Sequence, residues 1–400
     1  MKNIWRQDFP QINSESVYLD TAAMSFKPQA VIDEVNHYYH DLSVNVHRGM
    51  YQESLEASKL YEEARAKIAA FINASVEETV FTRGTTSSIN LVASSYGLEM
   101  IGSGDEIITS ELEHHSSFLP WQMVAKKKHA VLKFIPLSIE GRITVENFRK
   151  TITAKTKVVA LTYVSNVMGY ITPIQEIIEI AHEYGAVVVL DGAQAVQHMA
   201  IDVKALDVDF LAFSGHKMLG PTGIGILYGK KTLLDKMEPL ELGGDMNEDV
   251  EKDFSTWKVT PYKFEAGTMP VASVIGMSKA IEYLQNIGLS NIDSMIRQLY
   301  KYTYAQLKKI PGITIYNPDA DTGIIAFNLD NVPSHDAVSY FADKRICIRA
   351  GHHCAMLVTK WLGIPSCLRA SFYLYNTYEE ADKLIQTTKN AVQFFRELGF

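Results

Sequence analysis

Between residues 157 and 229 the sequence alternates apolar, β-branched stretches with an amphipathic segment, and this pattern restricts the fold more than any other feature. The segment 173–185 has helical periodicity, with a proline at its start and a glycine at its end. The apolar stretches predict buried strands at 157–164, 186–194, 208–217 and 223–229. Strands that alternate with helices form βαβ units, so the sequence predicts an α/β fold with a mostly parallel sheet and helices on both faces.

The chain is 400 residues long, which is more than one hydrophobic core usually organises. We expect a large domain at 22–275 and a smaller α+β domain formed by 1–21 and 276–400. Two long helices, two strands and a closing helix are predicted toward the C-terminus, at 271–288, 290–310, 312–317, 323–330 and from about Glu379.

The composition excludes several classes of protein. Lys and Arg number 38 against 46 Asp and Glu, and the net charge of −8 leaves no basic footprint for nucleic acid or an acidic membrane. No window reaches the ~18 apolar residues of a membrane span, and the N-terminal stretch lacks the apolar part of a secretion signal. The three cysteines, Cys347, Cys354 and Cys367, have no CxxC spacing, so we expect free thiols, a cytoplasmic protein and no metal.

Polar residues cluster where the predicted strands end. In parallel sheets ligands bind beyond the carboxyl ends of the strands, and these residues are Asn166, Asp191, Ser214, His216 and Lys217. The segment 79–97 reads as strand, turn and helix. Its turn, with Gly84, Thr85 and Thr86, offers backbone N–H groups, hydroxyls and a helix dipole to an anion.

Lys217 follows an apolar strand in the stretch SGHKMLGPTGIG, where an amine is well placed to form an imine with a carbonyl cofactor. Taken alone it could equally be a surface lysine. Asp191 could hold a pyridine nitrogen protonated, and the turn at 84–86 could hold a phosphate, which together favour pyridoxal 5'-phosphate (PLP). The ring of His114 or His115 could lie over the pyridine, and we favour His114.

Longer motifs carry a resemblance to a known family. They occur in order along the chain and include YLDTAAMSFKP (18–28), RGTTSSINLV (83–92), DGAQAVQH (191–198), SGHKMLGPTGIGILYG (214–229) and RAGHHCAM (349–356). With these motifs the chain resembles the group II, SUF-type cysteine desulfurases, which are fold-type I, class V aminotransferase-like PLP enzymes. The resemblance spans essentially the whole sequence.

The resemblance implies roles for individual residues. Lys217 would carry PLP as a Schiff base, Asp191 would pair with the pyridine nitrogen, Gln194 would contact the phenolic oxygen, and His114 would stack on the ring and handle protons. The phosphate would be held by Thr85, Thr86, Ser214 and His216, with Thr268 reaching across from the partner subunit of a homodimer. The substrate carboxylate would be received by Asn166 and Arg369, with Arg349 nearby.

The resemblance also implies a reaction and partners. L-cysteine would become L-alanine, with its sulfur left as a persulfide on Cys354 and passed on for iron–sulfur cluster assembly. The sulfur acceptor would be SufU-like or SufE-like. His335 in VPSHDAV matches a histidine of SufU-partnered relatives and favours a SufU-like acceptor. A selenocysteine lyase or cysteine-sulfinate desulfinase stays open within the same fold.

Two readings from other classes also stay open. A metallohydrolase could use His114, His115, His352 and Cys354 as ligands, and a non-catalytic scaffold could take part in sulfur transfer.

Residues near Cys354 also have structural interpretations. We expect His352 and His353 to fix the loop geometry by hydrogen bonding. Cys347, in an apolar run, is expected in the core, and Cys367 is expected to be structural.

Overall fold

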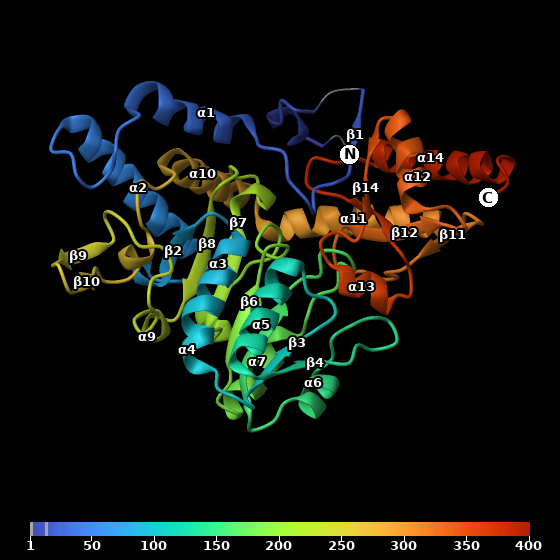
Figure 1. Cartoon of the computed structure of the whole chain (residues 1–400). Helices are drawn as coiled ribbons and strands as arrows, with labels where there is room; N and C mark the ends of the chain where they lie inside the picture. The colour runs from blue at the N-terminus through green and yellow to red at the C-terminus, as the bar shows by residue number, and fades with distance from the viewer. Residues whose placement is uncertain (1–2, 13–14) are drawn as a thin grey trace.

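A seven-stranded sheet organises the larger part of the computed structural model, which describes residues 3–12 and 15–400 (Figure 1). Its strand order is β2-β8-β7-β6-β5-β3-β4, and β8 runs antiparallel to both of its neighbours, β2 and β7. The carboxyl ends of the other strands therefore meet at one edge. The strand bounds are β2 Thr79–Thr82, β3 Glu106–Thr109, β4 Val131–Phe134, β5 Thr156–Thr162, β6 Val187–Asp191, β7 Phe210–Ser214 and β8 Gly225–Gly229.

The sheet is covered on both faces because alternate residues of its buried strands point to opposite sides. Val159 and Leu161 of β5 belong to one apolar cluster, with residues of α2 (Gln52–Phe71), α7 (Ile174–Glu183) and α10 (Val271–Ile287). On β5, Val158 and Ala160 belong to another cluster, with residues of α3 (Thr85–Val92) and α5 (His115–Lys128). Shorter or flanking helices are α1 Gln29–His37, α4 Leu98–Met100, α6 Val145–Thr151, α8 Val203–Leu206 and α9 Lys231–Leu234.

A second, antiparallel sheet lies toward the C-terminus, in the order β11-β12-β15-β14. Its apolar face packs into a separate cluster with α11, α12 and α14, and the N-terminal strand β1 pairs with β13 beside it. Both ends of the chain lie on this side of the molecule (Figure 1). The bounds are β1 Val17–Tyr18, β11 Ile313–Ile315, β12 Ile324–Leu329, β13 Ile346–Cys347, β14 Arg349–Gly351, β15 Cys367–Ser371, α11 Leu289–Leu307, α12 Ser334–Asp343, α13 Met356–Trp361 and α14 Tyr378–Glu397.

The predicted α/β architecture and its mostly parallel sheet are confirmed, as are the predicted strands and helices of both parts. The division into 22–275 and 1–21 with 276–400 stays a prediction, since its boundary at 275/276 falls inside α10. Residues 1, 2, 13 and 14 of the N-terminal segment lie outside the described residues.

A hairpin of β9 (Asn247–Val250) and β10 (Ser255–Trp257) extends from the large sheet's side. Within the described ranges, no helix is both long and apolar enough to cross a membrane.

Candidate active site

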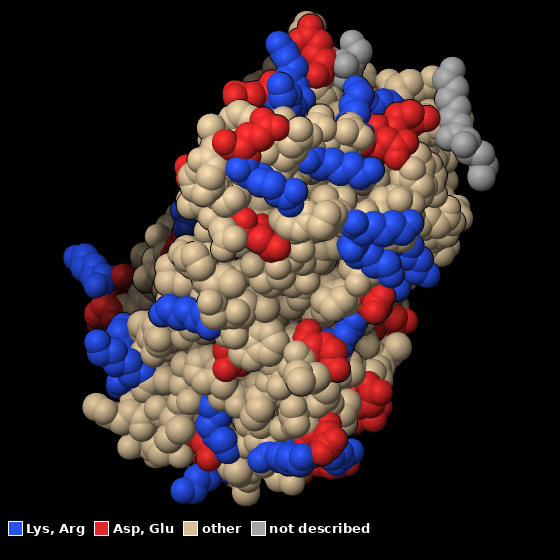
Figure 2. All heavy atoms as spheres, turned by 90° about the vertical axis from the view of Figure 1, so that its right-hand side faces the viewer, with Lys and Arg blue, Asp and Glu red and all other residues tan. Residues whose placement is uncertain are grey.

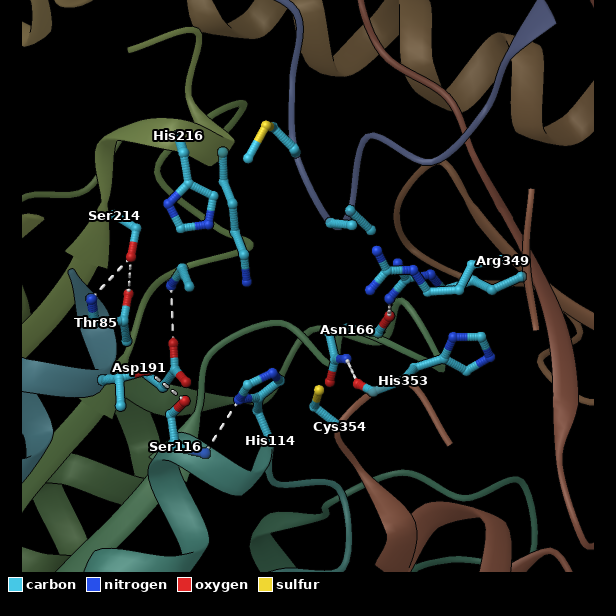
Figure 3. A pocket seen from close by; sticks show the side chains of 17 residues that line it. Thr85, His114, Ser116, Asn166, Asp191, Ser214, His216, Arg349, His353 and Cys354 are labelled. Carbon is cyan, nitrogen blue, oxygen red and sulfur yellow. Dashed lines mark hydrogen bonds between the residues drawn. The ribbon is translucent and has the colours of Figure 1, made fainter. Parts of the chain in front are cut away.

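A cavity of about 240 Å³ lies at the carboxyl edge of the large sheet, and β14, β15 and the loop that carries Cys354 close its other side (Figure 3). The two parts of the chain thus contribute to one site. Most of the residues singled out in the sequence line it, namely Thr85, Thr86, His114, Asn166, Asp191, Ser214, His216, Lys217, Arg349, Cys354 and Arg369.

Two predicted site residues do not line this cavity. Gln194 is buried nearby, where its Nε2 donates to the carbonyl of Ala22 at 2.7 Å and its Oε1 accepts from Gln197 at 3.1 Å. Thr268 is exposed on the loop before α10. Their predicted contacts with the cofactor stay predictions, and for Thr268 the contact was expected in the partner subunit's site.

The turn before α3 brings together the groups that are expected to form the anion cup. The hydroxyl of Ser214, at the end of β7, accepts from the backbone N–H of Thr85 at 2.8 Å and lies 2.7 Å from its hydroxyl. Gly84 precedes the helix with φ of 150°, a conformation that L side chains rarely adopt. A Cβ on Gly225 would lie 2.4 Å from the Cα of Gly84, so β8 can approach this turn only because position 225 is glycine.

Asp191, which is buried, and Lys217, which is partly buried, lie at the ends of adjacent strands and act on each other's charge. Burial lowers the pKa of Lys217, while Asp191 acts in the opposite direction. Burial likewise raises the pKa of Asp191, against the effect of Lys217 and of a hydrogen bond from the Ala193 N–H at 3.0 Å. The site thus combines an amine that gives up its proton more readily than usual with a carboxylate available to a cationic ring nitrogen.

His114 stands at the start of α5 with one ring nitrogen already engaged. Its Nδ1 accepts from the backbone N–H of Ser116 at 3.1 Å, which caps the helix. Burial, followed by the positive charges of Lys217 and other neighbours, lowers its pKa to about 3. The imidazole is therefore neutral at neutral pH, with a second nitrogen free to exchange a proton inside the cavity.

Arg349 and Arg369 lie directly opposite each other on β14 and β15, so their side chains share one face of the small sheet. Asp20 bridges them, with one oxygen 3.0 Å from Arg369 Nη2 and the other 3.1 Å from Arg349 Nε. Arg369 also donates from Nη1 to the carbonyl of Asn166 at 2.8 Å. Among the described residues, the buried Nε of Arg369 and Oδ1 of Asn166 have no hydrogen-bond partner, which leaves polar atoms for a bound ligand.

The segment with Cys354 is a loop whose backbone is unusual. His353 and Cys354 both have positive φ, of 53° and 55°, which few non-glycine residues adopt. His352 Nδ1 lies 2.8 Å from the Thr359 hydroxyl, and His353 donates from Nε2 to the carbonyl of Cys367 at 2.9 Å. These contacts agree with the expectation that the two histidines fix the loop.

The three cysteines differ in their surroundings. Cys354 is exposed at the cavity, as a reactive thiol must be, and Cys367 is buried, where burial raises its pKa to about 12. The expectation that Cys347 belongs to the core is wrong. Strand β13 buries Ile346 and turns the neighbouring Cys347 outward, because successive side chains of a strand alternate between its faces.

We expect His353 to make the fold sensitive to acid. Burial lowers its pKa to about 3, so as pH falls below about 6.5 the unfolded chain takes up a proton that the folded chain refuses. Stability should fall between about pH 6.5 and 4, by up to about 1.4 kcal/mol per pH unit for this group. Denaturant unfolding at several pH values should show a flatter profile for His353→Gln, which keeps a donor for Cys367. Parallel profiles would contradict the assignment.

The residues at the cavity fit PLP. Hydroxyls and helix N–H groups are gathered in a cup where Gly84 leaves room, and a buried carboxylate and a partly buried amine lie one strand apart. The cup would hold the phosphate, Asp191 the pyridine nitrogen and Lys217 the aldehyde carbon.

The metal-site alternative finds no ligand set. In the described part of the chain, no three His, Cys, Asp or Glu side chains lie close enough to hold a metal ion. His114 and His352 instead make the hydrogen bonds given above, to Ser116 and Thr359.

Sequence reasoning missed three contributors. Asp20 lies in YLDTAAM but had no assigned role, although it bridges both arginines. Ser116 lines the cavity and its hydroxyl lies 2.7 Å from that of Thr86. Glu113 is fully buried next to His114, and burial raises its pKa to about 8. A carboxyl residue directly before a candidate site histidine was the available signal.

Comparison with known proteins agrees with this site. Residues 17–384 match the family model for aminotransferase class-V. A probable cysteine desulfurase from Halalkalibacterium halodurans is 49% identical over 393 residues, covering 97% of each chain. The cysteine desulfurase CsdA from Escherichia coli is 40% identical, with a TM-score of 0.92 over 97% of this chain and 98% of that one.

A cysteine desulfurase from Thermococcus onnurineus is 39% identical, with a TM-score of 0.94 over 97% of each chain. The expected fold-type I architecture is thus confirmed over nearly the whole length. The residues that line the cavity, Lys217 and Cys354 among them, lie within the matched residues 17–384. The chain belongs to the aminotransferase class-V family and, within it, to the cysteine desulfurases.

Proposed function

We propose that this enzyme converts L-cysteine to L-alanine with PLP on Lys217 and leaves the sulfur as a persulfide on Cys354. The observation that supports this most is that an amine, a guanidinium and an exposed thiol, from Lys217, Arg369 and Cys354, share one cavity of about 240 Å³. When bound, PLP supplies the electron sink that makes the Cα proton of an amino acid acidic.

The substrate would be oriented through its carboxylate. Arg369 offers its unpaired Nε and a fork geometry suited to carboxylates, and Asn166 lies beside it. This would place the amino group toward Lys217 and the side chain toward the loop at the cavity mouth.

The proton transfers would fall to Lys217 and His114. Because burial lowers the pKa of Lys217, its amine can take the Cα proton more readily than an exposed lysine could. The neutral His114, with one nitrogen fixed on Ser116, can move a proton at its other nitrogen.

Sulfur transfer would take place at Cys354. Its Sγ forms a bond with the substrate sulfur while the C–S bond of the substrate breaks, and the electron pair of that bond stays on carbon and takes up a proton. The thiol of Cys354 and L-cysteine thereby become a persulfide and L-alanine, with all atoms retained. No further oxidant or reductant is required.

We further propose a homodimer and a dedicated sulfur acceptor for iron–sulfur cluster assembly, SufU-like or SufE-like. Exposed apolar side chains such as Met50, Tyr51 and Leu55 around the start of α2 support a second copy, as does the exposed Thr268.

The three free cysteines support a reducing, cytoplasmic setting. Acidic and basic side chains intermingle on the face in Figure 2, which favours a protein partner there over nucleic acid.

The test is alanine released from L-cysteine by purified, PLP-loaded protein with a thiol reductant, compared with selenocysteine and cysteine sulfinate. Alanine and sulfide in equal amounts from L-cysteine would support the proposal. Release from selenocysteine or sulfinate alone would replace it with the corresponding lyase or desulfinase, since the cofactor-binding residues are the same for all three.

Arg369→Lys is expected to raise KM for L-cysteine by about tenfold or more, because a point charge cannot replace the bidentate fork. Arg369 is almost completely buried and held by Asp20 and Asn166, which fixes the direction of its fork in the cavity. Steady-state kinetics would measure this. Arg345→Lys serves as the control, because Arg345 is exposed. An unchanged KM for Arg369→Lys would show that Arg369 does not bind the substrate carboxylate.

A further inference from the structure

His115, the neighbour of the ring-stacking candidate, makes two hydrogen bonds to the loop of Cys354. Its backbone N–H donates to the carbonyl of Cys354 at 2.6 Å. Its ring Nε2 accepts from the backbone N–H of Met356 at 3.1 Å. One residue at the start of α5 thus holds the loop at the reactive cysteine itself and at the residue two positions after it.

The loop needs such an anchor because its own conformation is unfavourable. His353 and Cys354 are consecutive residues with positive φ, and neither is glycine. Such conformations persist when surrounding contacts enforce them. Ala355, between the two bonded positions, is completely buried, so the anchored segment is fixed on the protein side while Cys354 stays exposed.

The other contacts of the loop do not replace this anchor. His352 and His353 bond to Thr359 and Cys367, which belong to the same small unit as the loop. Asn166 reaches the loop from the large domain, donating to the carbonyl of His353 at 2.8 Å, but it also faces the cavity. His115 contacts the loop without lining the cavity.

We propose that His115 is a positioning residue that ties the Cys354 loop to the start of α5 and so fixes the approach of the Cys354 sulfur to the substrate sulfur. The inference rests on the proposed function for its catalytic consequence, but the anchor itself does not. Burial and the neighbouring His352 lower the pKa of His115, which favours the neutral ring, and the hydrogen bond from the Met356 N–H makes Nε2 its unprotonated nitrogen.

The first test is hydrogen exchange at the Met356 amide in substrate-free, PLP-loaded protein. His115→Ala removes the acceptor and should speed exchange by about tenfold or more, whereas His115→Gln offers an amide oxygen at a similar reach and should restore protection. His129→Ala is the matched control, since His129 is an exposed histidine at the other end of α5. Unchanged protection in His115→Ala would overturn the anchor.

The second test is alanine formation from L-cysteine by the same variants. His115→Ala should lower kcat by about tenfold or more, because a displaced nucleophile reacts slowly, with KM and the absorbance of bound PLP near wild type. His115→Gln should recover most of the rate. A slow His115→Gln with normal Met356 protection would overturn a purely positioning role, as would a rise in KM alone.

The two failures are distinguishable. If the wild-type protein releases no alanine, the proposed function fails, while the exchange experiment still decides whether His115 anchors the loop. Should His115→Ala not fold, His115→Asn takes its place, because its shorter amide falls short of Met356 and the same loss of protection is expected.

Discussion

Lys217→Ala is expected to abolish alanine formation from L-cysteine, by at least about a thousandfold, since it removes both the attachment of PLP and the base for the Cα proton. The lysine lies partly buried just after the end of β7, and Asp191 and Arg369 both act on its charge. No second lysine lines the cavity in the part of the chain that the structure describes. Alanine assays and the absorbance of covalently bound PLP would measure the loss.

The control for this variant is Lys204→Ala, which removes an exposed lysine of α8 in the same part of the molecule. It should leave both readings unchanged. Normal turnover in Lys217→Ala would overturn the assignment of the lysine and, with it, the proposed chemistry of the cavity. Loss of turnover with covalent PLP retained would place the attachment on a different amine.

Cys354→Ser is expected to form no persulfide and to lower the rate of alanine formation at least about a hundredfold, while PLP still binds. A hydroxyl is a far weaker nucleophile toward sulfur than a thiolate. The loop should keep its shape, because the hydrogen bonds that hold it involve the backbone of Cys354 and its neighbours, not the thiol. The absorbance of bound PLP and a thiol-specific persulfide label would separate the two effects.

Cys347→Ser is the matched control, since Cys347 is an exposed thiol on β13 that does not line the cavity. Loss of bound PLP in Cys354→Ser would show that Cys354 has a structural role. Loss of persulfide in Cys347→Ser, with Cys354 intact, would show that the sulfur acceptor is Cys347 and not Cys354.

The strands that lead to site residues could be predicted because each is a short apolar run followed by polar residues or glycine. β5, β6, β7 and β8 were all expected within a few residues of their observed bounds. Since parallel strands end at one edge, Asp191 and Lys217 could be placed together from the sequence. The antiparallel β8 is a short apolar run like the parallel strands, so its direction could not be predicted from the hydrophobic pattern.

Contacts between residues far apart in the sequence could not be predicted from periodicity. Asp20 reaches Arg369 across 349 positions within the smaller part, and His115 reaches Met356 across 241 between the two parts. Such pairs depend on how distant segments pack together, which no local pattern encodes. Cys347 was misplaced for a related reason, because a two-residue strand gives too little alternation to tell which side faces the core.

The central claim is that Cys354 accepts the sulfur of L-cysteine, and the most direct test is to locate that sulfur after one turnover. PLP-loaded protein would be mixed with L-cysteine without reductant, alkylated and digested, and the masses of the cysteine-containing peptides would be measured by mass spectrometry. We predict one additional sulfur atom on the peptide with Cys354, formed with one alanine per site, and none on the peptides with Cys347 or Cys367. Alanine formed while the Cys354 peptide stays unmodified would contradict the account.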